Sequence, residues 1–104
     1  MKGDFYTGLI RLHVLHHAAK EGSIFGLGMI EELGEHGYRL SPGTLYPILH
    51  RLEEAGYLKS RRQLVGGKIR RGYTITARGR RELELGRHRV RELFGELFED
   101  KNDR

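Results

Sequence analysis

The side chains with the clearest chemistry in this sequence are cationic, and they are concentrated in one stretch. Residues 55–81 contain nine Lys or Arg residues and no Asp or Glu. Because the chain has 19 basic and 14 acidic residues in all, the remainder holds ten basic and 14 acidic groups. A local positive charge on a mildly acidic body is typical of a protein that binds a polyanion. A merely solvated charged surface is the alternative.

A second set of polar groups lies at the expected start of a helix. Ser41 can accept hydrogen bonds from unpaired helical N–H groups, and Pro42 suits the first helical position. Gly43 allows close approach of the backbone, and a helix N-terminus favours a phosphate. The hydroxyls of Thr44 and Tyr46 can bond to phosphates or base edges. Two alternatives stay open, a pure capping role for Ser41 and packing of Tyr46 against a neighbouring hairpin.

Three histidines near the N-terminus raise the question of a metal site. His13 and His17 are four residues apart, which places them on one helix face, with His16 beside them. No Glu separates the pair as in the zinc-protease helix, the chain has no Cys, and no third ligand is evident. We therefore expect no metal and no cofactor, and interpret these histidines as a polar helix face or interface groups.

Catalytic motifs are missing from the sequence. There is no nucleophile–base motif, no paired catalytic carboxylate pattern and no phosphate-binding P-loop, and Gly66-Gly67 has the character of a turn. The sequence therefore predicts a protein that is not an enzyme.

The elements that position these groups follow from apolar periodicity and turn residues. Helices are expected over 5–20, 26–34 and 41–55, and strands over 57–65 and 69–75 with Gly66-Gly67 as their turn. Thr76 is expected to cap a last helix, 77–98. This order predicts a mainly α fold with a small β-hairpin (α+β), a winged helix-turn-helix. We divide it into a DNA-binding domain (1–76), a C-terminal dimerisation helix (77–98) and a disordered tail (99–104).

The helix predicted over 41–55 is apolar on one side, with Leu45, Ile48, Leu49 and Leu52 at helical spacing. Gly56 is expected to end it as a C-terminal cap. Pro47 conflicts with a regular helix because it lacks an N–H and crowds the preceding turn. We expect a distorted or kinked helix there, and not two separate helices.

The chain resembles the PadR family of bacterial transcriptional regulators. The resemblance covers about residues 8–85 and rests on three runs, FGLGMIEEL (25–33), LSPGTLYPILHRLEEAGYL (40–58) and YTITARGRREL (73–83). The family's pattern also has a proline at the position of Pro47. The resemblance implies a homodimer that binds a palindromic operator in double-stranded DNA through the third helix and the hairpin wing. It further implies repression that is relieved by a stress signal or small molecule. The single C-terminal helix matches the family's short type.

The predicted DNA-binding residues lie on the third helix and the wing. We expect phosphate contacts from most of the wing cations and insertion into the minor groove by one of Lys68, Arg70 or Arg71. The full set is Ser41, Gly43, Thr44, Tyr46, His50, Arg51, Arg61, Arg62, Lys68, Arg70 and Arg71. A winged-helix module that binds protein, and no operator, is the alternative function.

The last helix carries an apolar seam that a small body cannot cover alone. Leu83, Gly86, Val90, Leu93 and Leu97 follow alternating spacings of three and four residues, as in a coiled coil. The predicted dimer interface comprises Leu9, Leu83, Val90, Leu93, Phe94, Leu97 and Phe98. Folding back onto its own domain is the alternative. A small-molecule pocket is expected between the first and last helices, near Phe5, Tyr6, Phe94 and Phe98.

The location of the protein is predicted from what the sequence lacks. It has no Cys and no pattern of a secretory signal, and Arg11 and His13 interrupt its most apolar run. We therefore expect a soluble cytoplasmic protein with no membrane partner.

Overall fold

The computed structural model describes residues 2–99 of the chain. Its elements are α1 (Lys2–Glu21), β1 (Ile24–Phe25), α2 (Gly26–Glu35), α3 (Pro42–Glu54), β2 (Leu58–Val65), β3 (Lys68–Ile75) and α4 (Ala77–Phe98). The predicted mainly α fold with a small β-hairpin is confirmed. The predicted elements are all present, and β1 is an additional short strand that the sequence analysis did not anticipate.

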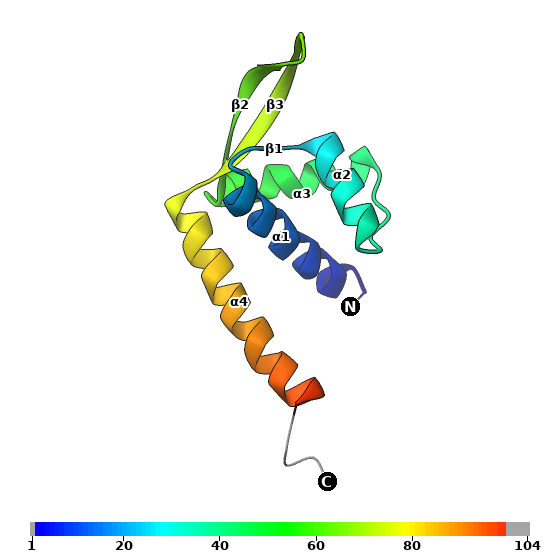
Figure 1. Cartoon of the computed structure of the whole chain (residues 1–104), viewed down its shortest axis with the longest axis vertical. Helices are drawn as coiled ribbons and strands as arrows, with labels where there is room; N and C mark the ends of the chain where they lie inside the picture. Colours follow the sequence, from blue (N-terminus) through cyan, green and yellow to red (C-terminus); the bar gives the residue numbers. More distant parts are fainter. Residues whose placement is uncertain (1, 100–104) are drawn as a thin grey trace.

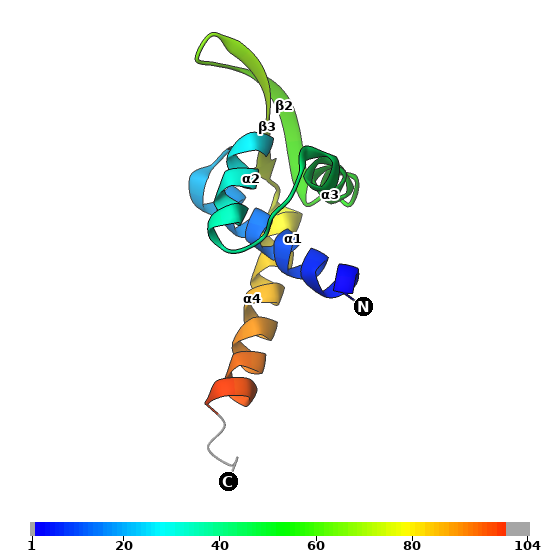
Figure 2. The same ribbon diagram turned by 90° about the vertical axis from the view of Figure 1, so that its right-hand side faces the viewer.

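The first three helices form the body of the molecule. In Figure 1 the β2–β3 hairpin extends from one end of this body, and α4 runs away from it toward the other end. Figure 2 shows the same separation from the side. The apolar stripe of α3 is buried in the core, which also contains Val14 and Leu33. Burial of this stripe leaves the opposite face of α3 exposed along its length.

The ends of α3 agree with the prediction in part. The helix is continuous from Pro42 to Glu54, so Pro47 does not divide it. At its end Gly56 adopts a φ of +86°, and the N–H groups of Gly56 and Tyr57 donate to the carbonyls of Glu53 and Leu52, both at 2.9 Å. This is the Schellman cap, in which a left-handed glycine satisfies the last helical carbonyls.

The alternative of a side-chain capping role for Ser41 is not supported by the structure. Ser41 occupies the N-cap position with extended backbone, but its side chain makes no capping hydrogen bond. Its hydroxyl instead lies 3.4 Å from the hydroxyl of Thr44. The fixed φ of Pro42 favours the first turn even without a capping side chain.

A two-residue turn joins β2 and β3. Gly66 and Gly67 have φ values of +57° and +83°, the combination that a tight hairpin turn requires. The strands pair antiparallel from Leu58↔Ile75 to Val65↔Lys68, and β1 pairs with the base of β3 through Ile24↔Tyr73. The outer part of the hairpin therefore stands free of the body, as Figure 1 shows.

The start of α4 is fixed tightly to the body. The Thr76 hydroxyl accepts a hydrogen bond from the Gly79 N–H at 2.9 Å, which confirms the predicted cap. A Cβ at Gly79 would lie 2.2 Å from the carbonyl oxygen of Tyr57, and one at Gly86 would lie 2.6 Å from a methyl group of Leu12. Glycine at both positions therefore lets α4 lie close to the hairpin base and to α1.

The rest of α4 extends beyond the body, and the molecule measures 58 × 28 × 23 Å. Of the predicted disordered tail, 99–104, only Glu99 belongs to the described residues, where it follows the last turn of α4. Within residues 2–99, no helix has both the length and the apolar character needed to cross a membrane.

Candidate nucleic-acid interface

The exposed face of α3 presents different polar groups at its two ends. Ser41, Gly43 and Thr44 are exposed at its start. Near its end, the imidazole of His50 lies 3.5 Å from the carboxylate of Glu54 in an exposed pair. A carboxylate at this end disfavours a polyanion, so the N-terminal half of α3 is the part suited to an anionic ligand.

Gly43 has no packing reason to be a glycine. A Cβ at this position would meet only the Ser41 hydroxyl oxygen, at an ordinary distance of 3.7 Å. Glycine in a helix is less favourable than alanine by about 0.5–1 kcal/mol. Gly43 therefore lowers the stability of the helix in the isolated chain, but it leaves the backbone at the exposed start of α3 open to close approach by an external ligand.

Tyr46 lies close to the start of α2 and also borders the hairpin. Its ring crosses the start of α2 so closely that a Cβ on Gly26 would lie 2.2 Å from the hydroxyl oxygen. The side chain is still 39% exposed. It lines a groove of about 390 Å³, together with Phe25, Gly26, Leu27, Lys68, Ile69, Arg70 and Arg71. Tyr46 therefore stands between the two helices and the wing.

The remaining α3 candidate, Arg51, lies on the flank of the helix that faces α1. It borders a small hollow with Thr7, Arg11 and Ile48. Arg51 and Arg11 together place positive charge beside the exposed face, on the side opposite the wing groove.

The wing concentrates positive charge in an arrangement that is unfavourable for the chain alone. Arg62 lies directly opposite Arg71 in the strand register, and Lys68 is the first residue after the turn. Like charges facing each other across two strands destabilise a hairpin. Within residues 2–99, none of the nine cationic side chains of 55–81 forms an ion pair with a carboxylate. This positive field is therefore available to an external anion.

Hydrogen bonds connect the wing to α3. The carboxylate of Glu53 accepts from the Ser60 N–H at 3.2 Å and from the Ser60 hydroxyl at 2.8 Å. The guanidinium of Arg71 donates to the same hydroxyl at 3.0 Å. Arg71 is thereby directed back toward α3, which leaves Lys68 and Arg70 as the candidates nearer the tip of the wing. The sequence analysis did not foresee this connection.

Two more cations lie at the base of the wing and on its second face. The guanidinium carbon of Arg78 lies 5.6 Å from the ring centroid of Tyr57, a cation–π contact. Arg61 lies opposite Gly72, on the other face of the hairpin from Arg62. The wing therefore carries exposed cations on both of its faces.

The predicted seam of α4 is divided by the structure. Leu83 is buried in the core of its own chain, with 8% exposure, so its burial requires no partner. The other predicted interface residues of α4 are 46–72% exposed, and they are Val90, Leu93, Phe94, Leu97 and Phe98. Leu9, on α1, has an intermediate exposure. An exposed apolar strip thus runs along α4 from Val90 to Phe98.

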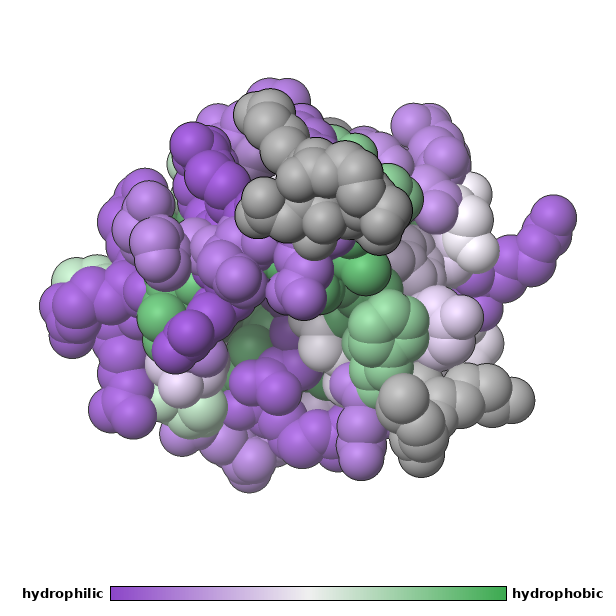
Figure 3. Space-filling view, turned by 90° about the horizontal axis from the view of Figure 1, so that it is seen from below, coloured by the Kyte–Doolittle hydropathy of each residue, from purple (hydrophilic) through white to green (hydrophobic). Residues whose placement is uncertain are grey.

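This strip borders an open groove between α1 and α4. The groove has a volume of about 610 Å³ and is lined mainly by Leu9, Leu12, Leu83, Val90 and Phe94, with His13, His16, Arg87 and Arg91 at its edges. Figure 3 views the molecule from this end and shows hydrophobic side chains around a hollow within a hydrophilic surface.

The pocket predicted from four aromatic residues is not formed as expected. Phe94 lines the large groove, whereas Phe5 lines a different groove between the same helices. Tyr6 packs edge-on against Phe5, and Phe98 packs against Phe94, with ring centroids 5.0 and 5.1 Å apart. Each of these aromatic rings therefore packs against a neighbour in its own helix, and the four rings do not line one common pocket.

A helix with an exposed polar start, preceded by two packed helices and followed by a basic hairpin, defines a winged helix-turn-helix protein. The sequence model of the Transcriptional regulator PadR-like family matches residues 14–85. The chain belongs to this family and is a transcriptional regulator of the PadR type.

Individual relatives agree with this assignment. The chain is 47% identical over 95 residues to Transcriptional regulator Rv3488 of Mycobacterium tuberculosis. The matched region covers 91% of this chain and 88% of the relative. A PadR family regulator of Eggerthella lenta shares 30% identity with a TM-score of 0.70, covering 94% of this chain and 88% of that structure. A PadR-like transcription factor of Bacteroides fragilis gives 26% identity and a TM-score of 0.77, with 88% and 89% covered.

Proposed function

We propose that this protein is a homodimeric, sequence-specific DNA-binding regulator that acts as a repressor. The observation that carries the proposal is the positive wing, whose cations form no ion pair with a carboxylate within residues 2–99. Lys68, Arg70 and Arg71 border one groove with Tyr46, near the start of α3, while Glu53 and Ser60 join the base of the wing to the last turn of α3. Such a pair of surfaces suits one DNA duplex, with a helix in the major groove and a hairpin along the adjacent backbone.

Each surface has its own task in this arrangement. The start of α3, with Gly43, Thr44 and Tyr46, approaches base edges and the phosphates that flank them. Lys68 and Arg70 near the wing tip contact phosphates or the narrow minor groove. His50 and Arg51 lie farther along α3, where only phosphate contacts are within their reach. The first set determines which sequence is bound, and the second adds affinity for any sequence.

A homodimer accounts for the apolar strip of α4. Val90, Leu93 and Leu97 are about half exposed or more, and an apolar surface of this kind is typical of an interface. Pairing of α4 with the α1–α4 groove of a second copy buries it on both chains. Two-fold symmetry then presents two copies of α3 to a palindromic operator.

Repression follows from occupancy of a promoter, and its relief by a stress signal or small molecule requires a ligand that changes the DNA-binding geometry. We place the signal site within or beside the contacts of α1, because α1 packs against α2, α3 and α4. A ligand held there reaches both the dimer helix and the helix-turn-helix pair.

A gel-shift assay with the promoter upstream of the protein's own gene tests the proposal. We expect a discrete complex that an unlabelled copy of the promoter displaces and that a scrambled duplex of equal length displaces much less. Absence of any complex at low salt would favour the alternative, a winged-helix module that binds protein.

A further inference from the structure

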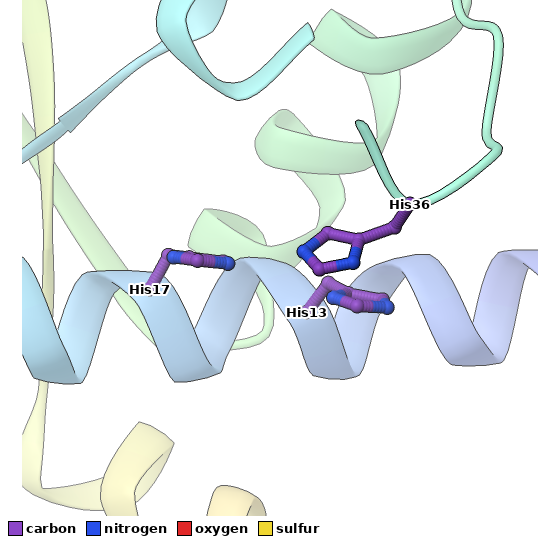
Figure 4. A group of neighbouring side chains, drawn as sticks. All are labelled: His13, His17 and His36. Carbon is purple, nitrogen blue, oxygen red and sulfur yellow. The ribbon is translucent and has the colours of Figure 1, made fainter. Parts of the chain in front are cut away.

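Three histidines converge on the side of the body formed by α1 and α2. His13 and His17 lie one turn apart on α1, and His36 directly follows α2. One ring nitrogen from each residue lies within 4.8 Å of the other two. Figure 4 shows the rings of His13 and His36 beside each other, with His17 directed toward them from the next turn. The sequence analysis missed this group because its third member comes from a different helix.

A carboxylate completes the group. One oxygen of Glu32, on α2, lies 3.5 Å from Nε2 of His17 and 3.3 Å from Nε2 of His36. Tetrahedral zinc binds imidazole nitrogen and carboxylate oxygen at about 2.0–2.2 Å, which separates neighbouring donor atoms by about 3.3 Å. The three histidine nitrogens lie within 4.8 Å of one another, and the Glu32 oxygen lies 3.3 and 3.5 Å from two of them, so side-chain rotation can bring these donors to the separation that zinc needs.

His17 is held in the orientation that a metal ligand needs. It is buried, with 6% exposure, and its Nδ1 lies 2.9 Å from a carboxylate oxygen of Glu21. When Nδ1 donates to Glu21, the lone pair of Nε2 faces His36 and Glu32. A carboxylate behind a ligating histidine fixes the ring and raises its basicity in many metal sites.

The environment of His13 favours its neutral imidazole, the form that binds a metal. Burial lowers the pKa of His13 below its ordinary value, and the neighbouring His36 and His17 lower it further. Three imidazole nitrogens and one carboxylate oxygen suit zinc and its neighbours in the first transition row. Magnesium and calcium prefer all-oxygen sites, and copper(I) prefers thiolates.

We propose that His13, His17, His36 and Glu32 bind a divalent transition-metal ion, with zinc as the representative ion. The ion would connect α1 to the end of α2, where the chain leaves for α3. Drawing His36 toward α1 shifts the residues that lead into the start of α3. This part rests on the proposed function. The metal ion is the signal to which the regulator responds, and its binding weakens binding of the operator.

Calorimetric titration of the full chain with zinc chloride tests the site itself. We expect one zinc per chain, with at least about a tenfold loss of affinity in His36→Ala and in His13→Ala. His36 is exposed at a helix end, so its replacement leaves the core intact, and circular dichroism verifies this. His16→Ala removes an exposed histidine beside the cluster and should bind zinc like the parent. A parent without zinc binding, or an unchanged affinity in His36→Ala, would overturn the proposal.

Binding of the promoter duplex with and without zinc tests the regulatory part. Coupling between two sites usually changes affinity by about five- to 150-fold. We expect zinc to weaken DNA binding within that range in the parent and to have no effect in His36→Ala. Zinc binding that leaves the affinity for DNA unchanged would refute the regulatory link. If the protein binds no DNA under any condition, the proposed function fails, while the zinc titration still decides the metal site.

Discussion

The carboxylate of Glu53 on α3 accepts both hydrogen bonds that Ser60 on β2 can donate, at 3.2 Å from the N–H and 2.8 Å from the hydroxyl. The contact joins the last turn of α3 to the base of the wing. Since Arg71 donates to the same hydroxyl at 3.0 Å, it also fixes one wing cation. This acidic side chain thus helps to fix the angle between the helix and the wing.

Glu53→Ala should destabilise the fold and weaken DNA binding together. The change leaves a half-buried N–H without its partner, which costs about 1–3 kcal/mol in the free energy of unfolding. Loss of a negative charge alone would strengthen binding to DNA, so weaker binding reports the lost geometry. Urea unfolding and fluorescence anisotropy with the promoter duplex measure the two effects.

Glu54→Ala is the matched control for that variant. Among residues 2–99, Glu54 pairs only with exposed His50, a contact worth less than about 1 kcal/mol. Its removal should leave stability nearly unchanged and DNA affinity equal or higher. If both variants bind DNA equally well, the role of Glu53 in orienting the wing is refuted.

Gly43→Ala should change stability and DNA affinity in opposite directions. A methyl group has room here and helix propensity improves by up to about 1 kcal/mol, so the melting temperature should rise. The same methyl group hinders approach of the backbone to DNA, so operator affinity should fall. Equal affinity for the operator would show that α3 does not approach DNA at this residue.

Gly79→Ala should destabilise the protein because its Cβ would meet the carbonyl oxygen of Tyr57 at 2.2 Å. Overpacking of this kind costs typically about 1–3 kcal/mol. Gly95→Ala, farther along α4, meets nothing within 4 Å and should be neutral or stabilising. Thermal unfolding of both variants checks the close docking of α4, which two equal melting temperatures would contradict.

Leu93→Asp combined with Leu97→Asp should convert a dimer to a monomer. The two residues are 48% and 60% exposed, so charges there leave the core of each chain intact. Sedimentation velocity measures the state, and circular dichroism monitors the fold. Leu85→Asp, an exposed residue outside the predicted seam, is the control. A double variant that sediments as the parent does would reject the α4 strip as the interface.

The parts of this fold that local chemistry dictates could be predicted from the sequence. Consecutive glycines require the tight turn after Val65, and Thr76 precedes a helix whose N–H groups need an acceptor. Short-range signals of this kind depend only on neighbouring residues. They also located the wing cations, since charge clustering is visible without a structure.

Features that join distant segments could not be predicted in the same way. The Glu53–Ser60 contact, the pairing of Ile24 with Tyr73, and the place of His36 beside α1 all depend on how helices pack. The burial of Leu83 also could not be predicted from the sequence, because Leu83 occupies the same heptad position as the exposed seam residues. Three-dimensional packing decides which part of a periodic apolar pattern faces the chain's own core.

The salt dependence of operator binding tests the central claim most directly. Lys68→Ala combined with Arg70→Ala should lower the slope of log affinity against log salt by about two, since each lost phosphate contact removes about 0.9. Arg87→Gln, which removes a charge paired with Glu84 on α4, should leave the slope unchanged. An unchanged slope in the wing variant, with normal folding, would contradict the account of a wing that contacts DNA.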